Sequence, residues 1–256
     1  MSQSKRINLL GVNVSRYDLN ETIDYMCDTI DEGKKMRMAV TPVNCILWAH
    51  KDKNLRDIYN SADMVTADGV PLIWASRLLG EPIHGRVTGL DLLPEFSKVA
   101  AQHGYRFFFL GAAPGVVEKL SEVLMRKNPD LNIAGIYTPP FADSFSEEEN
   151  LKIIELINQS NANILWVSLT APKQDFWIAE HFDLLKVNIA IGVGAAFDVV
   201  AGNIKRAPVW MQRVGLEWFF RLLMEPRRLA KRYLFEAPKF LPLVLKQKFQ
   251  NKRYDQ

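Results

Sequence analysis

Residues 106–115 read Arg106-Phe107-Phe108-Phe109-Leu110-Gly111-Ala112-Ala113-Pro114-Gly115, and they contain the clearest strand signal in the chain. The aromatic and aliphatic run predicts a buried strand. The small residues that follow it, ending in Pro-Gly, predict a tight turn into a helix. A strand that leads through a short turn into a helix is the repeating unit of a parallel sheet.

The same order recurs on both sides of this stretch. Strand-like runs lie at residues 6–10, 37–41, 64–67, 106–110, 131–136, 164–169 and 188–193. Helical patterns lie between them, at residues 19–30, 44–60, 70–79, 90–103, 114–127, 146–159 and 172–185. This alternation predicts an α/β fold, a mostly parallel Rossmann-like sheet with helices on both faces.

The composition is that of a globular protein, with 48% hydrophobic and 24% charged residues. No apolar run approaches the roughly 20 residues that cross a bilayer, and the N-terminus lacks the apolar core of a signal peptide. The two cysteines, Cys27 and Cys45, belong to no Cys/His cluster, which argues against a disulfide framework or a zinc site. We therefore expect a cytoplasmic protein.

The charge changes sign near residue 205. From Lys205 onward, thirteen Lys and Arg accompany four Asp and Glu, whereas residues 1–204 hold 19 basic and 25 acidic side chains of the totals of 32 and 29. Strand and helix alternation also stops near residues 202–208, and three helices without strands are predicted beyond. We therefore expect an α/β body, residues 1–204, and a basic helical appendage, residues 205–256.

Apolar and basic residues recur at helical spacing in residues 216–233, LEWFFRLLMEPRRLAKRY. This pattern is typical of a helix that lies on an anionic membrane surface. A helical hairpin packed on the body, with a solvated basic face, is an open alternative. A second alternative is a nucleic-acid-binding protein whose tail follows phosphates. The interleaved aromatic residues favour lipid over nucleic acid as the partner.

In open parallel sheets, ligands bind beyond the carboxyl ends of the strands, where helix N-termini favour phosphate. Polar and glycine-rich junctions follow several of the predicted strands. The junctions that form the candidate site are residues 41–44, 67–69, 111–115, 170–174 and 192–198.

Asp68 is the candidate for acid–base chemistry. It follows an apolar strand, and a carboxylate backed by a low-dielectric core can act as a general base toward a hydroxyl group. Asp-Gly is also a common turn. Thr41 and Asn44 end a neighbouring predicted strand and can bind sugar hydroxyls, although Asn44 can equally cap the next helix.

Three further junctions can hold a phosphate or a sugar. Gly111 opens a loop that suits a nucleotide diphosphate at a helix start, although the loop lacks the middle glycine of the dinucleotide fingerprint and can be a plain turn. Lys173 and Gln174 offer a positive charge and an amide, or simply begin a helix. Gly194 leaves the backbone open to a ligand, and Asp198 can bind a hydroxyl group or cap a helix.

The chain has no Asp-X-Asp pair, no Walker loop and no His-X-X-X-His spacing, so we predict neither a metal nor a cofactor. Arginine, lysine and helix dipoles must then neutralise a phosphate leaving group. The candidate cations are Arg86, Lys173, Arg206, Arg213, Arg221, Arg227, Arg228 and Arg232.

Taken together, these segments resemble the WecG/TagA/CpsF family of bacterial glycosyltransferases over nearly the whole chain. The matching motifs are VN at 43–44, ADGVP at 67–71, RVTGLDL at 86–92, FLG at 109–111, APKQ at 171–174, GVGAAFD at 192–198, RAP at 206–208, GLEW at 215–218, RL at 221–222, EPRR at 225–228 and KRY at 231–233. Two positions depart from the family pattern, because Thr170 replaces the usual glycine before APKQ and Asp175 replaces the usual glutamate after it.

The resemblance implies an inverting, metal-independent transferase in cell-surface or exopolysaccharide synthesis. It would move a sugar from a UDP-sugar to a polyprenyl-diphosphate-linked saccharide while bound peripherally to the inner face of the cell membrane. The resemblance also implies Asp68 as the base, with Thr41, Asn44, Arg86 and Gln174 lining the site. Appendage arginines would complete it, and the closest candidates are Arg213, Arg221 and Arg228.

A nucleotide-sugar-modifying enzyme with no lipid substrate is a further enzymatic alternative, and it would keep its activity without the appendage. The sequence leaves the donor sugar, the acceptor saccharide and a homo-oligomeric state open.

Overall fold

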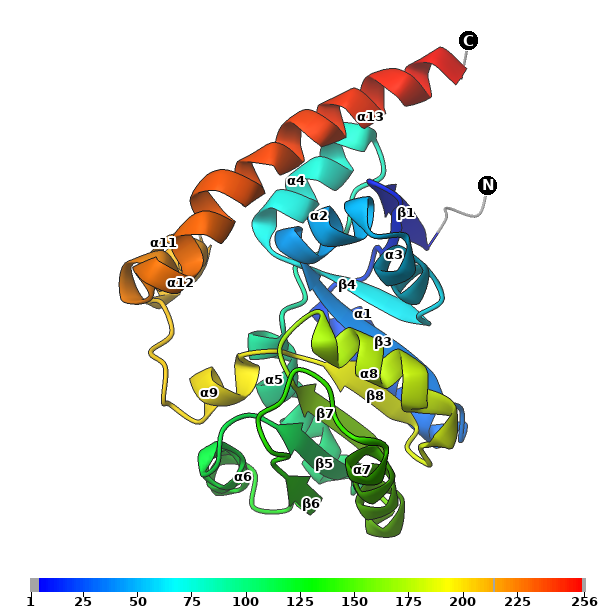
Figure 1. The fold of residues 1–256 in the computed structure, drawn as a ribbon, viewed down its shortest axis with the longest axis vertical. Helices are drawn as coiled ribbons and strands as arrows, with labels where there is room; N and C mark the ends of the chain where they lie inside the picture. The colour runs from blue at the N-terminus through cyan, green and yellow to red at the C-terminus, as the bar shows by residue number, and fades with distance from the viewer. Residues whose placement is uncertain (1–4, 214, 255–256) are drawn as a thin grey trace.

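The computed structural model describes residues 5–213 and 215–254, and the side chains of Arg213, Arg228 and residues 251–254 lie outside the description. Within these ranges, a six-stranded sheet has the order β4-β3-β8-β7-β5-β6 (Figure 1). Every neighbouring pair is parallel, which confirms the predicted α/β class. The strands are β3 (Met36–Pro42), β4 (Met64–Asp68), β5 (Arg106–Gly111), β6 (Asn132–Tyr137), β7 (Ile164–Ser168) and β8 (Ile189–Gly192).

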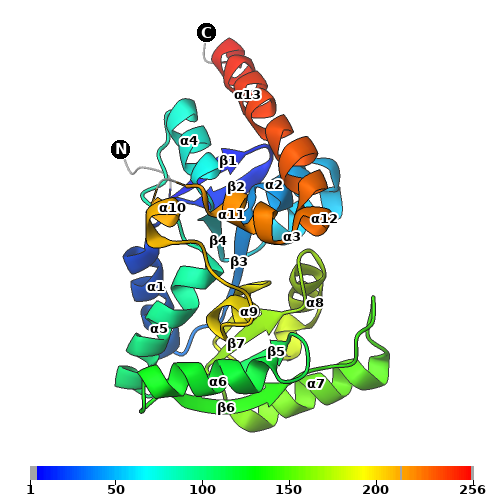
Figure 2. The same cartoon turned by 90° about the vertical axis from the view of Figure 1, so that its left-hand side faces the viewer.

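Helices follow the strands and form a layer on each face of the sheet (Figures 1 and 2). They are α1 (Leu19–Asp31), α2 (Val43–Lys51), α3 (Lys53–Asn60), α4 (Val70–Leu79), α5 (Gly89–His103), α6 (Val116–Lys127), α7 (Glu147–Ser160), α8 (Lys173–His181) with a 3-10 turn η1 (Phe182–Leu184), and α9 (Ala196–Val200).

Alternating side chains of the strands build the two layers. Phe107 and Phe109 face one side and pack in a core with α1, α5, α6 and α9. Phe108 and Leu110 face the other side and pack with α7 and α8. Helices α2 and α3 cover the part of this second face that β3 and β4 form. The predicted helices on both faces are therefore confirmed.

The first strand differs from the prediction. β1 (Arg6–Leu9) lies outside the main sheet and pairs antiparallel with β2 (Val12–Ser15), a strand that the sequence reading missed. Leu10 and Gly11 form the turn with φ values of 54° and 98°. Two-residue hairpin turns favour Asn or Gly where φ is positive. Because a leucine takes the first of these positions, the turn was hidden inside an apolar run.

Two of the predicted helices are interrupted. The predicted helix 44–60 divides at Asp52, whose extended backbone ends α2 and whose carboxylate accepts the Asn54 N–H (2.8 Å) to cap α3. The α-helical part of the predicted helix 172–185 is α8, which ends at His181. The 3-10 turn η1 follows it directly. The short helix α9 was not predicted.

The segment after residue 204 is helical, as predicted, but its divisions differ. It contains α10 (Val209–Arg213), α11 (Glu217–Met224), α12 (Pro226–Ala230), a π-helix η2 (Lys231–Glu236), a 3-10 turn η3 (Ala237–Lys239) and α13 (Phe240–Tyr254). Residues 226–254 form one helical rod, which we call the arm (Figures 1 and 2). Pro226, Pro238 and Pro242 do not break the rod, because each lies in the first turn of its segment, where proline is tolerated.

The arm rests on the body through α13, which lies beside α4 and α2 (Figure 1). Phe240 and Val244 are buried in the core that α2, α4 and the β1–β2 hairpin share. The Gln247 carboxamide accepts the Leu10 N–H (2.9 Å) and donates to the Asn8 carbonyl (2.8 Å).

Among the described residues, no helix is both long and apolar enough to cross a membrane.

Replacing Gln247 with alanine should lower the free energy of unfolding by about 1–3 kcal/mol, because two backbone groups of the hairpin lose their partner. Chemical denaturation measures this change. Gln250→Ala, on the exposed side of the same helix, is the matched control and should stay within about 0.5 kcal/mol of the parent. Equal losses in the two variants would contradict this mode of docking.

Candidate active site

The carboxyl ends of β3 and β4 lie side by side, with Pro42 paired to Asp68 and Thr41 to Ala67. The hydroxyl of Thr41 is buried and donates to the Thr66 carbonyl (2.7 Å). Asn44 is also buried, in the first turn of α2. Thr41 therefore holds the two strands together in this conformation, and Asp68 occupies the rim.

The junctions after β7 and β8 are joined by Gln174. The side-chain oxygen of Gln174 accepts the Gly194 N–H (3.0 Å). The Gln174 amide also lies close to Gly192, where an added Cβ would be only 2.7 Å from the amide nitrogen. A side chain at Gly192 would therefore displace Gln174. Gly194 has a φ of 53° and open space around its Cβ position, and its carbonyl accepts the Ser168 hydroxyl (2.7 Å). The loop is thus held by two side chains and has open space beside it.

The remaining predicted residues lie at the same edge. Gly111 packs so tightly on β7 that a Cβ would lie 2.4 Å from the Ser168 carbonyl oxygen, which explains the glycine without a ligand. Lys173 donates to the Ala142 carbonyl (2.5 Å) and lies 3.8 Å from the centre of the Phe145 ring, and burial lowers its pKa. Asp198 is half-buried in α9.

Four charged side chains connect the body to the appendage, and we call them the four-charge ring. Arg86 approaches Asp91 (3.3 Å) and Glu217 (3.6 Å). Arg206 approaches the same two carboxylates, Asp91 at 2.5 Å and Glu217 at 3.0 Å. Each charge thus has two partners of opposite sign, and the side chains are only 14–27% exposed. The ring fixes the first turn of α11 beside the start of α5.

This attachment brings appendage charges to Asp68. Burial raises the pKa of its carboxyl to about 6, and the guanidinium of Arg86 opposes this shift. Glu217 raises the pKa further, whereas Arg232 and then Arg221 lower it. Asp68 is therefore a largely desolvated carboxyl group whose pKa is raised, within electrostatic range of three guanidinium groups, two of them from the appendage.

Two of these arginines have unused donors. The Nε groups of Arg221 and Arg232 are buried and have no hydrogen-bond partner among the described residues. Buried donors of this kind favour an anionic ligand. Arg221 was predicted as a binding residue, whereas Arg232 was only one of many candidate cations. The two lie on different helices, because the backbone leaves the helical conformation at Glu225. The side chains of Arg213 and Arg228, predicted as binding residues, lie outside the described residues.

The sequence reading also missed the acidic members of the site. Asp91 and Glu217 belong to the motifs RVTGLDL and GLEW, but neither was identified as a functional residue. Both neutralise Arg86 and Arg206. Among the described residues, no group of three or more His, Cys, Asp or Glu side chains could hold a metal ion.

Comparisons with known proteins bear on this arrangement. A family model described as the Glycosyl transferase WecG/TagA/CpsF family matches residues 7–254. Three relatives share the name N-acetylglucosaminyldiphosphoundecaprenol N-acetyl-beta-D-mannosaminyltransferase. One from Bacillus spizizenii is 31% identical over 245 residues, which cover 95% of this chain and 91% of the relative.

The relative from Bacillus subtilis (strain 168) is 30% identical over 240 residues, covering 93% of this chain and 90% of its own. The relative from Staphylococcus aureus (strain MW2) is 24% identical over 249 residues, which cover 96% of this chain and 95% of the relative. Because the family match includes both the sheet that carries Asp68 and the arm that faces it, the resemblance read from the motifs is confirmed, and the chain belongs to the WecG/TagA/CpsF family of glycosyltransferases.

Proposed function

We propose that the protein transfers an N-acetylhexosamine from a UDP-sugar to a polyprenyl-diphosphate-linked saccharide. The observation that carries the proposal is a half-buried carboxyl group at the sheet edge, Asp68, within electrostatic range of appendage arginines. The relatives are named for transfer of N-acetylmannosamine to N-acetylglucosaminyldiphosphoundecaprenol, so UDP-N-acetylmannosamine and that acceptor are the first pair to test.

In this mechanism, ionised Asp68 takes the proton of an acceptor hydroxyl group as its oxygen attacks the anomeric carbon. The bond between the sugar and the diphosphate breaks, and UDP leaves with its electron pair. Attack opposite the leaving group inverts the anomeric configuration. An α-linked donor would then give a β-linked product, the configuration in the names of the relatives.

The leaving diphosphate needs positive charge, and we assign this role to arginines rather than to a metal ion. The Nε donors of Arg221 and Arg232, which have no partner in the described part of the chain, can bind its oxygens, and the guanidinium of Arg86 lies within electrostatic range of Asp68. Such donors stabilise developing charge most strongly where water is excluded. Metal independence is therefore part of the proposal, and Arg213 and Arg228 remain further candidates for diphosphate contacts.

The other predicted residues take supporting roles. Thr41 and Gln174 fix the strand ends and the loop of Gly194 through their hydrogen bonds to the backbone. Asn44 and Asp198 line the same edge, and we assign them to the sugar and the ribose. Lys173, at the start of α8, is placed to bind phosphate once it leaves the Ala142 carbonyl.

The lipid-linked acceptor implies work at a membrane surface. The appendage exposes large apolar side chains, each between 39% and 67% accessible: Trp218, Phe219, Leu223, Met224, Leu234 and Phe235. Exposed apolar residues interleaved with basic ones favour the interface of an anionic bilayer. We therefore propose peripheral association with the inner face of the cell membrane, with the appendage as the contact.

Asp68→Asn should lower turnover on the UDP-sugar and lipid-diphosphate pair by about a hundred- to ten-thousandfold, because the general base is lost. UDP binding, measured by calorimetry, should change little. Asp130→Asn, at an exposed turn, is the matched control. Turnover of the Asp68 variant within tenfold of the parent would refute the role of this carboxyl group.

The pH dependence of kcat/KM should report Asp68. Because its carboxyl must be ionised to accept a proton, activity should fall about tenfold per pH unit below pH 6 and level off above it. Arg86→Gln should move this acid limb to higher pH, since Arg86 is the strongest of the charges that lower the pKa. An acid limb that stays in place in this variant would argue against Asp68 as the titrating group.

The double variant Leu223→Glu, Phe235→Glu should bind phosphatidylglycerol liposomes at least about tenfold more weakly than the parent, because two large apolar contacts are lost. Sedimentation at several salt concentrations measures this. Leu151→Glu, an equally exposed leucine on α7, is the matched control. Salt-sensitive binding to DNA or RNA without liposome binding would instead support a nucleic-acid-binding tail.

A further inference from the structure

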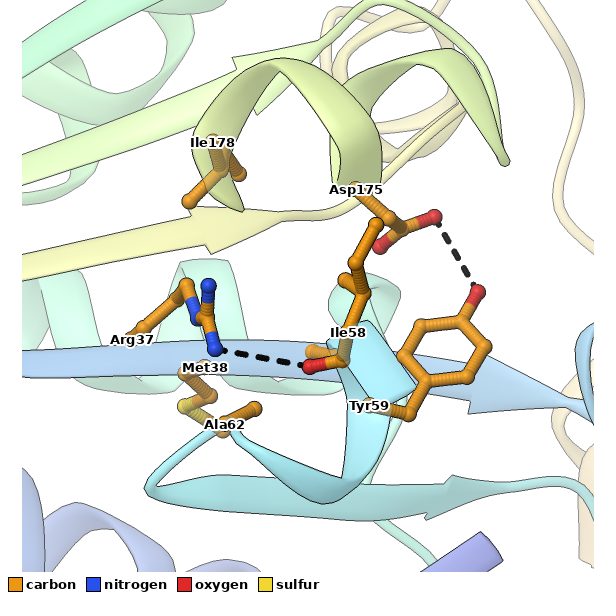
Figure 3. Close-up of a pocket in the computed structure, with 8 residues that line it drawn as sticks. Arg37, Met38, Ile58, Tyr59, Ala62, Asp175 and Ile178 are labelled. Carbon is orange, nitrogen blue, oxygen red and sulfur yellow. Dashed lines mark hydrogen bonds between the residues drawn. The ribbon is translucent and has the colours of Figure 1, made fainter. Parts of the chain in front are cut away.

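A buried polar contact lies behind the candidate site, between α3 and α8. The hydroxyl of Tyr59 donates to the carboxylate of Asp175 (3.2 Å), and both side chains are buried (Figure 3). Burial raises the pKa of Asp175 to about 7 and keeps Tyr59 protonated as a donor. A buried carboxyl group costs stability unless it is hydrogen-bonded, and the Tyr59 hydroxyl supplies that bond.

Asp175 follows Gln174 in the first turn of α8. The position of this turn decides where the Gln174 side chain lies, and Gln174 in turn holds the Gly194 N–H (3.0 Å). The Cβ-free backbone of Gly192 leaves the space that the amide occupies. A continuous chain of contacts thus runs from Tyr59 on α3 through Asp175 to the loop after β8.

The surroundings of the contact contain few charges. Arg37 of β3 lines the cavity beside Asp175, but its guanidinium donates to Ser61 (2.7 Å) and points toward the Ile58 carbonyl (Figure 3). Cys45 of α2 is buried nearby, and burial raises the pKa of its thiol. The Tyr59 hydroxyl is therefore the side-chain donor that holds the Asp175 carboxylate among the described residues.

We propose that Asp175 is a positioning residue for the donor: braced by Tyr59, it sets the first turn of α8, so that Gln174 holds the Gly194 loop open toward the diphosphate. The inference rests on the proposed function, because the diphosphate defines what the loop receives. The shared cavity has a volume of about 10 Å³ and borders both Tyr59 and Asp175. Glutamate keeps the carboxylate that accepts the Tyr59 hydrogen bond, so we expect glutamate to substitute for the aspartate.

The test compares Asp175→Ala, Asp175→Glu and Tyr59→Phe with the parent. Hydrogen exchange of a peptide covering residues 192–198 should be about tenfold faster in Asp175→Ala, faster in Tyr59→Phe, and within twofold of the parent in Asp175→Glu. The KM for the UDP-sugar and the Kd of UDP should rise about tenfold in Asp175→Ala, whereas the KM for the acceptor should stay within twofold. Ser121→Ala removes a buried hydroxyl of α6 and controls for general destabilisation.

Unchanged exchange in the 192–198 peptide of both Asp175→Ala and Tyr59→Phe would overturn the inference. Faster exchange with unchanged UDP affinity would overturn the inference as well, because the Tyr59–Asp175 contact would then stabilise the loop without affecting donor binding. If Asp175→Ala fails to fold, Tyr59→Phe carries the test, since its phenyl ring fills the same site. A parent protein that binds UDP but transfers no sugar would count against the proposed function. The UDP affinity and the hydrogen exchange of the variants would still decide whether the Tyr59–Asp175 contact positions the Gly194 loop.

Discussion

The four-charge ring of Arg86, Asp91, Arg206 and Glu217 is the contact on which the site depends. Two of its members precede the appendage in the sequence and two lie at its start. Since each charge is mostly buried and has two partners, removal of one leaves uncompensated charge in a low-dielectric setting, which typically costs several kcal/mol. The ring thus fixes α11, and with it Arg221, close to Asp68.

A second attachment holds the arm, which follows α11 in the chain. Phe240 and Val244 pack into the core of the body, and Gln247 bonds to the turn of the β1–β2 hairpin. Arg232 lies between the two attachments, on the π-helix, a local geometry often found at functional sites. Because the chain is held on both sides of Arg232, its guanidinium is positioned with few direct contacts, and its Nε has no hydrogen-bond partner among the described residues.

Local sequence patterns were sufficient for much of this architecture. The continuous aromatic and aliphatic run Phe107–Leu110 predicted a buried strand, and the position of Asp68 after an apolar strand predicted a carboxylate at the end of that strand. The β1–β2 turn was missed because Leu10 adopts a conformation that leucine rarely takes. Glu217 was missed, and Arg232 was not singled out among the candidate cations, because their roles arise only when the appendage folds back onto residues more than a hundred positions earlier. No local pattern specifies that contact.

The appendage acts on Asp68 in two opposed ways. Its bulk excludes water, and Glu217 adds negative charge, so both raise the pKa of the carboxyl group; Arg221 and Arg232 lower it again. A base useful near neutral pH needs this balance, because a strongly lowered pKa weakens proton affinity and a strongly raised one leaves the group protonated. The same guanidinium groups that tune the base also face the space for the leaving diphosphate. In the proposed mechanism, acid–base chemistry and leaving-group stabilisation are therefore coupled through the docked appendage.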